Sequence, residues 1–270
     1  MSEPQDLPAE VIDAVWDKIG PAVDSMLERV RSIRAFHTAA GSVLAGDDAG
    51  LRPTPYSVSA AAVSCLTSAI DHLHALKSYA VDGPVLHISS PFSLARGALE
   101  NLSIAYWILH PADRTDRLQH ALRWWAQNFL DAERALRPVG GIADGATESA
   151  LLQLEELARR TGVTATLIRK GHSSSVAVKY TNQHAIEARQ VLFAWQLCSG
   201  FAHGRGWAIH GVSSAETIRV AGQDEQIVRL SSNDTVLLWV TLTSHRLATE
   251  AFRILDQKCG DISGQSSAAE

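Results

Sequence analysis

The sequence has little cysteine, and none of it stands in paired motifs. Its 270 residues include three cysteines, Cys65, Cys198 and Cys259, which lie far apart and form no CxxC pair. A zinc ribbon or a thioredoxin-type redox motif needs closely spaced pairs, so both are excluded. An odd number of isolated cysteines is typical of reduced thiols, and we therefore expect a cytoplasmic protein.

A targeting segment and long apolar runs are also missing. The N-terminus, MSEPQDLPAE, lacks the basic start and apolar stretch of a secretory signal. No run of about 18 apolar residues occurs, so we expect no membrane span. HExxH and GxSxG motifs are absent, and Asp71, His72 and His74 form no metal-binding pattern. We therefore expect no metal, no cofactor and no serine-hydrolase activity.

Positive charge is outweighed, and lysine is scarce. The chain has 24 Lys+Arg, of which five are Lys, against 29 Asp+Glu, so its net charge is −5. This balance disfavours a nucleic-acid binder that is basic over its whole surface. A hydrophobic content of 46% also disfavours disorder. A small internal anion site built around single arginines remains compatible with this composition.

Helical spacing of apolar residues dominates the chain and predicts a mainly α fold, a bundle of about eight helices. Residues 217–230 alternate around Gly222-Gln223-Asp224, which predicts one β-hairpin before the last helix. No repeat or long linker divides the chain, so we expect a single α-helical domain over 8–259 and a disordered tail over 260–270. The predicted helices span 10–20, 21–45, 57–81, 91–109, 112–136, 147–160, 184–203 and 234–258.

The segment 91–109 contains charge in an unexpected place. It is apolar nearly all round, which predicts a central, buried helix. Arg96 and Glu100 are four residues apart on one face of it, and Ser103 and Trp107 continue that face. Two interpretations fit: an internal ion pair that fixes helix register, or a polar pocket in which Arg96 holds a phosphate or carboxylate.

The end of the predicted helix 184–203 offers a second group of polar residues. Trp195, Ser199 and His203 follow one another at spacings of four and share a face. Gly204 is a suitable helix terminator. At the C-terminal end of a helix the macrodipole favours a protonated histidine. His203 therefore suits acid–base chemistry near neutral pH, although it also suits simple capping of carbonyls.

The run S-x-x-x-H-G from Ser199 to Gly204, preceded by R-x-x-x-E from Arg96 to Glu100, resembles the motifs of HEPN-type helical bundles. The resemblance covers about residues 57–205. It implies a helical bundle and, for many HEPN proteins, metal-independent ribonuclease activity in toxin or defence systems. It therefore implies RNA or a nucleotide as the partner.

One part of the HEPN ribonuclease motif is missing. In that motif an Arg is followed by four to six residues and then His, but the matching positions ahead of His203 hold Cys198, Leu197 and Gln196. Either the ribonuclease chemistry is absent, or Arg96 or Arg205 takes the role in space. The candidate catalytic residues are His203, Arg96, Glu100 and Ser199, and the candidate anion-binding residues are Arg205 and Arg96.

Two alternatives rest on other segments. Residues 152–170 resemble a helix-turn-helix with Gly162 in the turn, and 157–186 contain five cations and no acid. These residues predict either a DNA-binding regulator or a solvated basic connection; the candidate nucleic-acid patch consists of Arg159, Arg160, Arg169 and Lys170. Trp124, Trp125 and Phe129 stand at helical spacing, which predicts core packing or a dimer face. A non-catalytic scaffold protein that forms a homodimer is therefore an alternative function.

Overall fold

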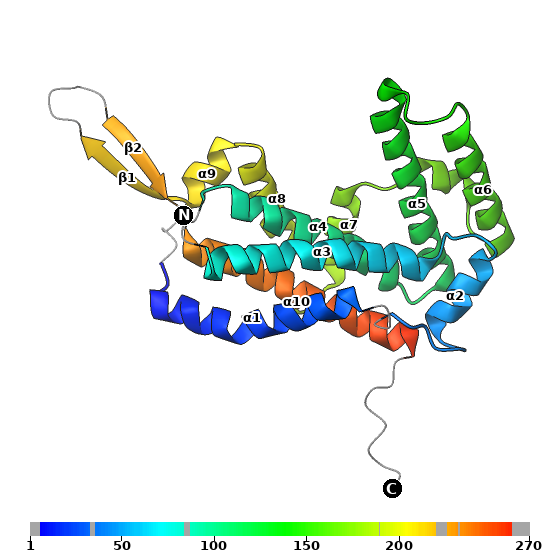
Figure 1. Ribbon diagram of the computed structural model, residues 1–270, viewed down its shortest axis with the longest axis horizontal. Coiled ribbons are helices and arrows are strands. Elements are labelled where there is room, and N and C mark those ends of the chain that lie inside the picture. Colours follow the sequence, from blue (N-terminus) through cyan, green and yellow to red (C-terminus); the bar gives the residue numbers. More distant parts are fainter. Residues whose placement is uncertain are drawn as a thin grey trace, which may run out of the picture. The chain divides into compact units, whose positions relative to one another are not determined.

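The computed structural model describes residues 6–32, 36–83, 87–188, 190–219, 226–231 and 233–260; the expected tail lies outside the described residues from 261 onward. It is mostly helical, as predicted, with more than the about eight helices expected (Figure 1). The α-helices are α1 (Ala9–Arg31), α2 (Val43–Leu51), α3 (Val58–Val81), α4 (Ser90–Leu109), α5 (Arg114–Leu136), α6 (Ala146–Thr161), α7 (Ser174–His184), α8 (Val191–Ala202), α9 (Gly206–Val212) and α10 (Asp234–Cys259). The 3₁₀ helices are η1 (Arg137–Val139) and η2 (Ala165–Lys170), and the strands are β1 (Ser214–Arg219) and β2 (Gln226–Ser231).

The chain divides into two compact units. Unit 1 comprises Met1–Ser32, Thr67–Asn101 and Asn182–Ala248; unit 2 comprises Ile33–Leu66, Leu102–Thr181 and Thr249–Glu270. Helices α3, α4, α7 and α10 contribute residues to both. A single domain over 8–259 stays a prediction.

In unit 1, helix α1 packs against residues of α3 and α10. Trp16, Ile19 and Leu238 form a buried apolar cluster. Lys77 donates two hydrogen bonds of 3.0 Å to the carboxylate of Asp24, which joins α3 to α1. These contacts stabilise the part of unit 1 that leads into α4.

Pro21 lies inside α1, so the predicted helix boundary at this residue is wrong. A proline usually breaks or kinks a helix because it removes one backbone hydrogen bond and its ring clashes with a preceding carbonyl. Here the buried residues Trp16 and Ile19 before it and Val23 and Leu27 after it continue one apolar stripe. Packing of this stripe outweighs the local cost, and the helix ends only at Arg31.

In unit 2, α5 packs against α6 and η2, and α2 packs against α5 and α6. The predicted helix 21–45 and the loop expected at Asp47–Gly50 are corrected by α2, which begins after Ser42. The Ser42 hydroxyl accepts a hydrogen bond from the Ala45 N–H at 3.2 Å and caps this helix. The carboxylate of Asp48 in turn accepts the N–H groups of Val58 and Ser59, at 2.9 and 3.2 Å, and caps α3.

Two further predictions concern the region around α8. The helix predicted over 184–203 is in fact the end of α7 and, after a break in which Gln190 has a φ of 68°, helix α8. Strands β1 and β2 pair antiparallel, with Ser214 opposite Ser231 and Arg219 opposite Gln226. Gly222, Gln223 and Asp224 lie outside the described residues, so the hairpin turn itself stays a prediction.

Candidate functional site

Helices α4 and α8 lie antiparallel in unit 1 and bring Arg96 and Glu100 of α4 next to Trp195 of α8. The rings of Phe92 and Phe201 stack with centroids 3.9 Å apart and an interplanar angle of 7°. Eight residues further along α4, the Trp195 indole N–H donates to Glu100 Oε2 at 3.2 Å. The two helices therefore run in opposite directions: the start of α4 lies beside the end of α8, and Glu100, further along α4, lies beside Trp195, nearer the start of α8.

Arg96 and Glu100 form the predicted pair, but they are not deeply buried. Arg96 Nη2 lies 3.4 Å from Glu100 Oε2, and the two side chains are 33% and 24% exposed. The expectation of a fully buried helix is thus correct for 102–109 and wrong at Arg96. Ser103 and Trp107, predicted to continue the face, are buried residues of unit 2.

The guanidinium of Arg96 has an unused donor. Its Nε is buried and has no hydrogen-bond partner among the described residues. A buried donor without an acceptor costs about 1–3 kcal/mol, so such atoms usually face a water molecule or a ligand. Arg96 is held by Glu100 on one nitrogen and remains available on another.

Cys198 lies on the side of α8 that faces Arg96. Burial raises the pKa of its thiol, and the positive charge of Arg96 acts in the opposite direction. Trp195, Cys198 and Phe201 therefore define the side of α8 that is turned toward α4. Because the thiol is fully buried and neutral, it fills space beside the guanidinium and does not compete for anions.

Ser199 and His203 lie on a neighbouring side of α8. Successive residues of a helix are rotated by about 100°, so Ser199 lies at about 100° and His203 at about 140° from Cys198. Helix α8 ends at Ala202, and Gly204 has the left-handed φ of 63° expected of a terminator. His203 is exposed and Ser199 half-buried.

Helix α9 covers the next side of α8. A Cβ on Gly200 would lie 2.5 Å from Ala208 Cβ and 3.0 Å from Trp207 Cζ2, so only glycine admits α9 at this distance. The Arg205 N–H donates to the Gly200 carbonyl at 2.8 Å and starts α9. Gly200 lies at about 200° from Cys198, so the Ser199–His203 side lies between α4 and α9.

The prediction of one helix ending at His203 missed α9, and with it Trp207. This tryptophan is 56% exposed, unusually high for so large an apolar residue. The signal in the sequence was Gly200 inside an apolar helix followed by G-R-G, which indicates a close approach and a reversal. The structure therefore brings Arg96, Glu100 and Trp195 together on one side of α8 and places His203, Arg205 and Trp207 at its C-terminal end.

Two of the four residues in the candidate nucleic-acid patch of unit 2, Arg159 and Arg169, are paired with nearby acids. Arg169 donates to both oxygens of Glu148, at 2.8 and 2.7 Å, and also pairs with Glu155. Arg159 pairs with Glu156, and Arg160 donates to two backbone carbonyls. The element after Gly162 is η2, a 3₁₀ helix of six residues and not a second α-helix. Lys170 is exposed.

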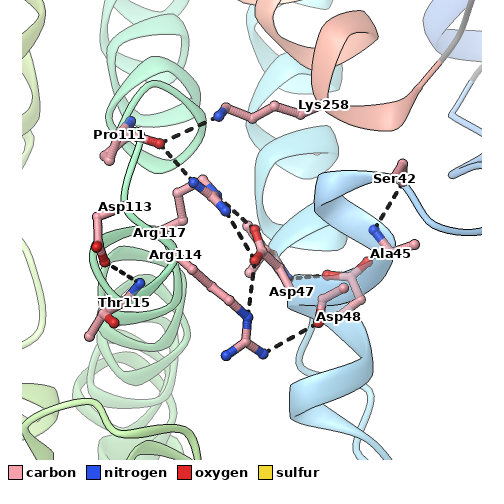
Figure 2. A network of polar contacts seen from close by, with 12 residues as sticks. Ser42, Ala45, Asp47, Asp48, Pro111, Asp113, Arg114, Thr115, Arg117 and Lys258 are labelled. Atoms are coloured by element: carbon pink, nitrogen blue, oxygen red, sulfur yellow. Dashed lines mark hydrogen bonds and ion pairs between the residues drawn. The ribbon is translucent and has the colours of Figure 1, made fainter.

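The arginine that is deeply buried is Arg117, at the start of α5. It donates to both carboxylate oxygens of Asp47, at 2.7 and 3.1 Å, and to the carbonyls of Pro111 and Ala112, at 2.9 and 2.7 Å. Figure 2 shows this network, in which Lys258 also donates to Pro111. Asp47 and Arg117 are 1% and 3% exposed. All nitrogens of Arg117 have acceptors, so this network is structural.

A cluster of aromatic and imidazole rings joins the end of α4 to α5 and α7 in unit 2. The imidazole of His120 stacks on Trp107 with centroids 3.9 Å apart, and His120 Nδ1–H donates to the Trp107 carbonyl at 2.7 Å. Burial lowers the pKa of His120 to about 4. Tyr180 donates to, or accepts from, His110 Nδ1 at 2.9 Å. These rings fill the core of unit 2, and the imidazole of His120 among them is neutral near pH 7.

The predicted aromatic stripe on α5 also packs within unit 2. Trp125 donates to the Ser57 carbonyl at 3.2 Å, and its ring lies 5.4 Å from Tyr56. Phe129 contacts Tyr56 edge-to-face at 5.6 Å. These contacts are intramolecular core packing, and a homodimer stays a prediction.

Further observations and comparisons complete the description. Within the described ranges, no helix is long and apolar enough to cross a bilayer, and no group of three or more His, Cys, Asp or Glu is arranged to hold a metal ion. Comparison with models of known protein families, with curated proteins and with solved structures finds no match to this chain.

Proposed function

We propose that unit 1 binds RNA, or a nucleotide, at Arg96 and cleaves a phosphodiester bond beside it. The observation that carries this proposal is the buried, unpartnered Nε of Arg96 next to the Arg96–Glu100 pair. A guanidinium recognises phosphate through several N–H groups at once. Glu100, itself held by Trp195, fixes the guanidinium while leaving a donor for the anion.

The position of Arg96 also addresses the incomplete ribonuclease motif. The motif position at Cys198 holds a buried thiol, and the positive charge of Arg96 on α4 acts on that thiol. The ribonuclease motif has its arginine on the same helix as the histidine, which here is α8. Arg96 supplies this positive charge from the neighbouring helix α4. The resemblance to HEPN-type bundles and this spatial replacement support the same function.

The proposed chemistry uses side chains alone. His203 takes the proton of a ribose 2′-hydroxyl, whose oxygen attacks the adjacent phosphorus while the bond from phosphorus to the 5′-oxygen breaks. The 5′-oxygen takes a proton from water, so the products are a 2′,3′-cyclic phosphate and a 5′-hydroxyl. Arg96 stabilises the charge that develops on the phosphorane oxygens. The protein acts in the cytoplasm, consistent with three buried cysteines that form no disulfide.

The two alternatives have less support. A helix-turn-helix regulator needs a recognition helix, and Gly162 is followed by the short 3₁₀ helix η2, with Arg169 already paired. A scaffold homodimer needs an apolar interface, and the aromatic residues of α5 pack inside unit 2. The anion site at Arg96 is therefore the best supported starting point for experiments.

An RNA degradation assay tests the proposal. With a labelled single-stranded RNA in EDTA, we expect the wild type to cleave. Both Arg96→Gln and His203→Ala should lower the rate constant by about 100-fold or more, because each removes charge stabilisation or proton transfer. Arg96→Gln should also weaken RNA binding by about tenfold, whereas His203→Ala should leave it nearly unchanged.

Matched controls come from the same unit. Arg31→Gln and His184→Ala replace an exposed arginine and an exposed histidine outside the site, and both variants should behave like the wild type. Equal, trace-level cleavage by the wild type, Arg96→Gln and His203→Ala would rule out the enzyme and leave a binding protein. RNA binding unaffected by Arg96→Gln would rule out the anion site.

A further inference from the structure

Trp207 is an exposed tryptophan of helix α9 that contacts α8. It is 56% exposed, and its six-membered ring rests on the backbone of α8 at Gly200. Contact with Gly200 restricts the orientation of the indole, so ligand binding would cost little conformational entropy. Large exposed aromatic residues of this kind are typical of binding surfaces.

The stretch of sequence around Trp207 contains no acidic residue. Residues 188–215 contain no Asp or Glu, two Arg and two His, in a chain whose net charge is −5. His203, Arg205 and His210 are all exposed around the ends of α8 and α9. An aromatic ring beside the Arg205 guanidinium and two imidazoles fits a ligand that has both a flat apolar face and negative charge.

We propose that His203, Arg205 and Trp207, here called the Trp207 surface, bind single-stranded RNA by stacking one base on the indole. This inference rests on the proposed function and names its substrate class. Single-strand binders combine positive charge with aromatic rings on which bases stack. The Ser199–His203 side of α8 lies between α4 and α9, so a chain stacked on Trp207 passes His203 on its way to Arg96.

The geometry favours a single strand over a duplex. In a duplex the bases are stacked on one another and their faces are closed to a protein ring, whereas unpaired bases expose theirs. Trp207 recognises a base face and carries no fork of donors for base edges. The surface should therefore bind single strands of different sequence with similar affinity.

Fluorescence anisotropy with labelled RNA tests the inference. We expect a single strand of roughly ten nucleotides to bind more tightly than a duplex of the same sequence. Trp207→Ala should weaken single-strand binding by about tenfold, while Trp207→Phe, which keeps a ring, should stay within about threefold of the wild type. Ile186→Ala, which truncates a 74% exposed apolar residue of the same unit, is the matched control and should change nothing.

The outcomes separate this inference from the proposed function. If Arg96→Gln weakens RNA binding and Trp207→Ala does not, the Trp207 surface is overturned while the anion site stands. If the wild type binds no RNA, both fail.

Light scattering tests for a protein partner. If the wild type is a dimer, Trp207→Ala is a monomer and RNA binding is unchanged, this surface is a dimer interface and the inference is overturned. Thermal unfolding of each variant checks that it is folded.

Discussion

Replacing Asp47 with alanine should lower the free energy of unfolding by about 3–5 kcal/mol, because the change leaves Arg117 charged and buried without its carboxylate. Arg117 is 3% exposed and uses Nε and Nη2 on Asp47. Urea unfolding followed by circular dichroism measures the loss.

Two comparisons make this prediction specific. Asp131→Ala breaks the Arg134–Asp131 pair, whose side chains are 76% and 56% exposed, and should cost about 0–1 kcal/mol. A double-mutant cycle tests the coupling of the two residues. In the Asp47→Ala background, Arg117→Ala should lower the free energy of unfolding by much less than Arg117→Ala does in the wild type, since the pair acts as one unit. A loss below about 1 kcal/mol for Asp47→Ala would show that the buried pair is not what stabilises this junction.

The same residues show what the sequence can and cannot predict about the fold. Helices such as α6 and α10 have regular apolar spacing and clear end signals, and the predictions 147–160 and 234–258 agree with them within one residue. The run Asp47-Asp48-Ala49-Gly50 has the composition of a turn, yet it lies in α2. Its helical conformation depends on Arg117, 70 residues away, and on the cap that Asp48 provides to α3. Contacts at such separations leave no local pattern.

The burial of an arginine does not follow from how apolar its own helix is. Arg96 stands in an almost wholly apolar helix and is one-third exposed, because in the first half of α4 only the side that carries Phe92, Ala95 and Leu99 is buried. Arg117 stands in an ordinary amphipathic helix and is buried, because a carboxylate from α2 meets it. Local hydrophobicity describes one helix, whereas burial depends on which elements cover it.

Part of the candidate site follows from spacing, and part does not. The four-residue interval from Ser199 to His203 predicts a shared side of α8, and the R-x-x-x-E interval predicts the Arg96–Glu100 pair. Trp195 as the partner of Glu100 depends on the antiparallel packing of α4 and α8. Trp207 depends on a chain reversal that only Gly200 and Gly204 allow. Neither relation is visible in a single stretch of sequence.

Lowering the pH from 6.5 to 4 should destabilise the protein by up to about 3 kcal/mol through His120 alone. Burial lowers the pKa of His120 from 6.5 to about 4 in the folded state. Below pH 6.5 the unfolded chain therefore binds a proton that the folded chain does not. Stability from this residue is fully present above pH 6.5, is lost progressively as the pH falls, and levels off below pH 4.

The variant His120→Asn isolates this contribution, since asparagine does not titrate and keeps a donor near the Trp107 carbonyl. It should be less stable than the wild type at pH 7.5, because the stacking on Trp107 is lost. Its stability should nevertheless fall less between pH 7.5 and 4.5, and the two curves should converge. Burial also lowers the pKa of His245, but that residue is unchanged in the variant, so its contribution cancels in the difference between the two stability curves.

The control is His37→Asn, which replaces an exposed histidine and should keep the wild-type pH dependence. Parallel curves for wild type and His120→Asn would show that folding does not lower the pKa of this imidazole, and the desolvated ring stack on Trp107 would have to be abandoned.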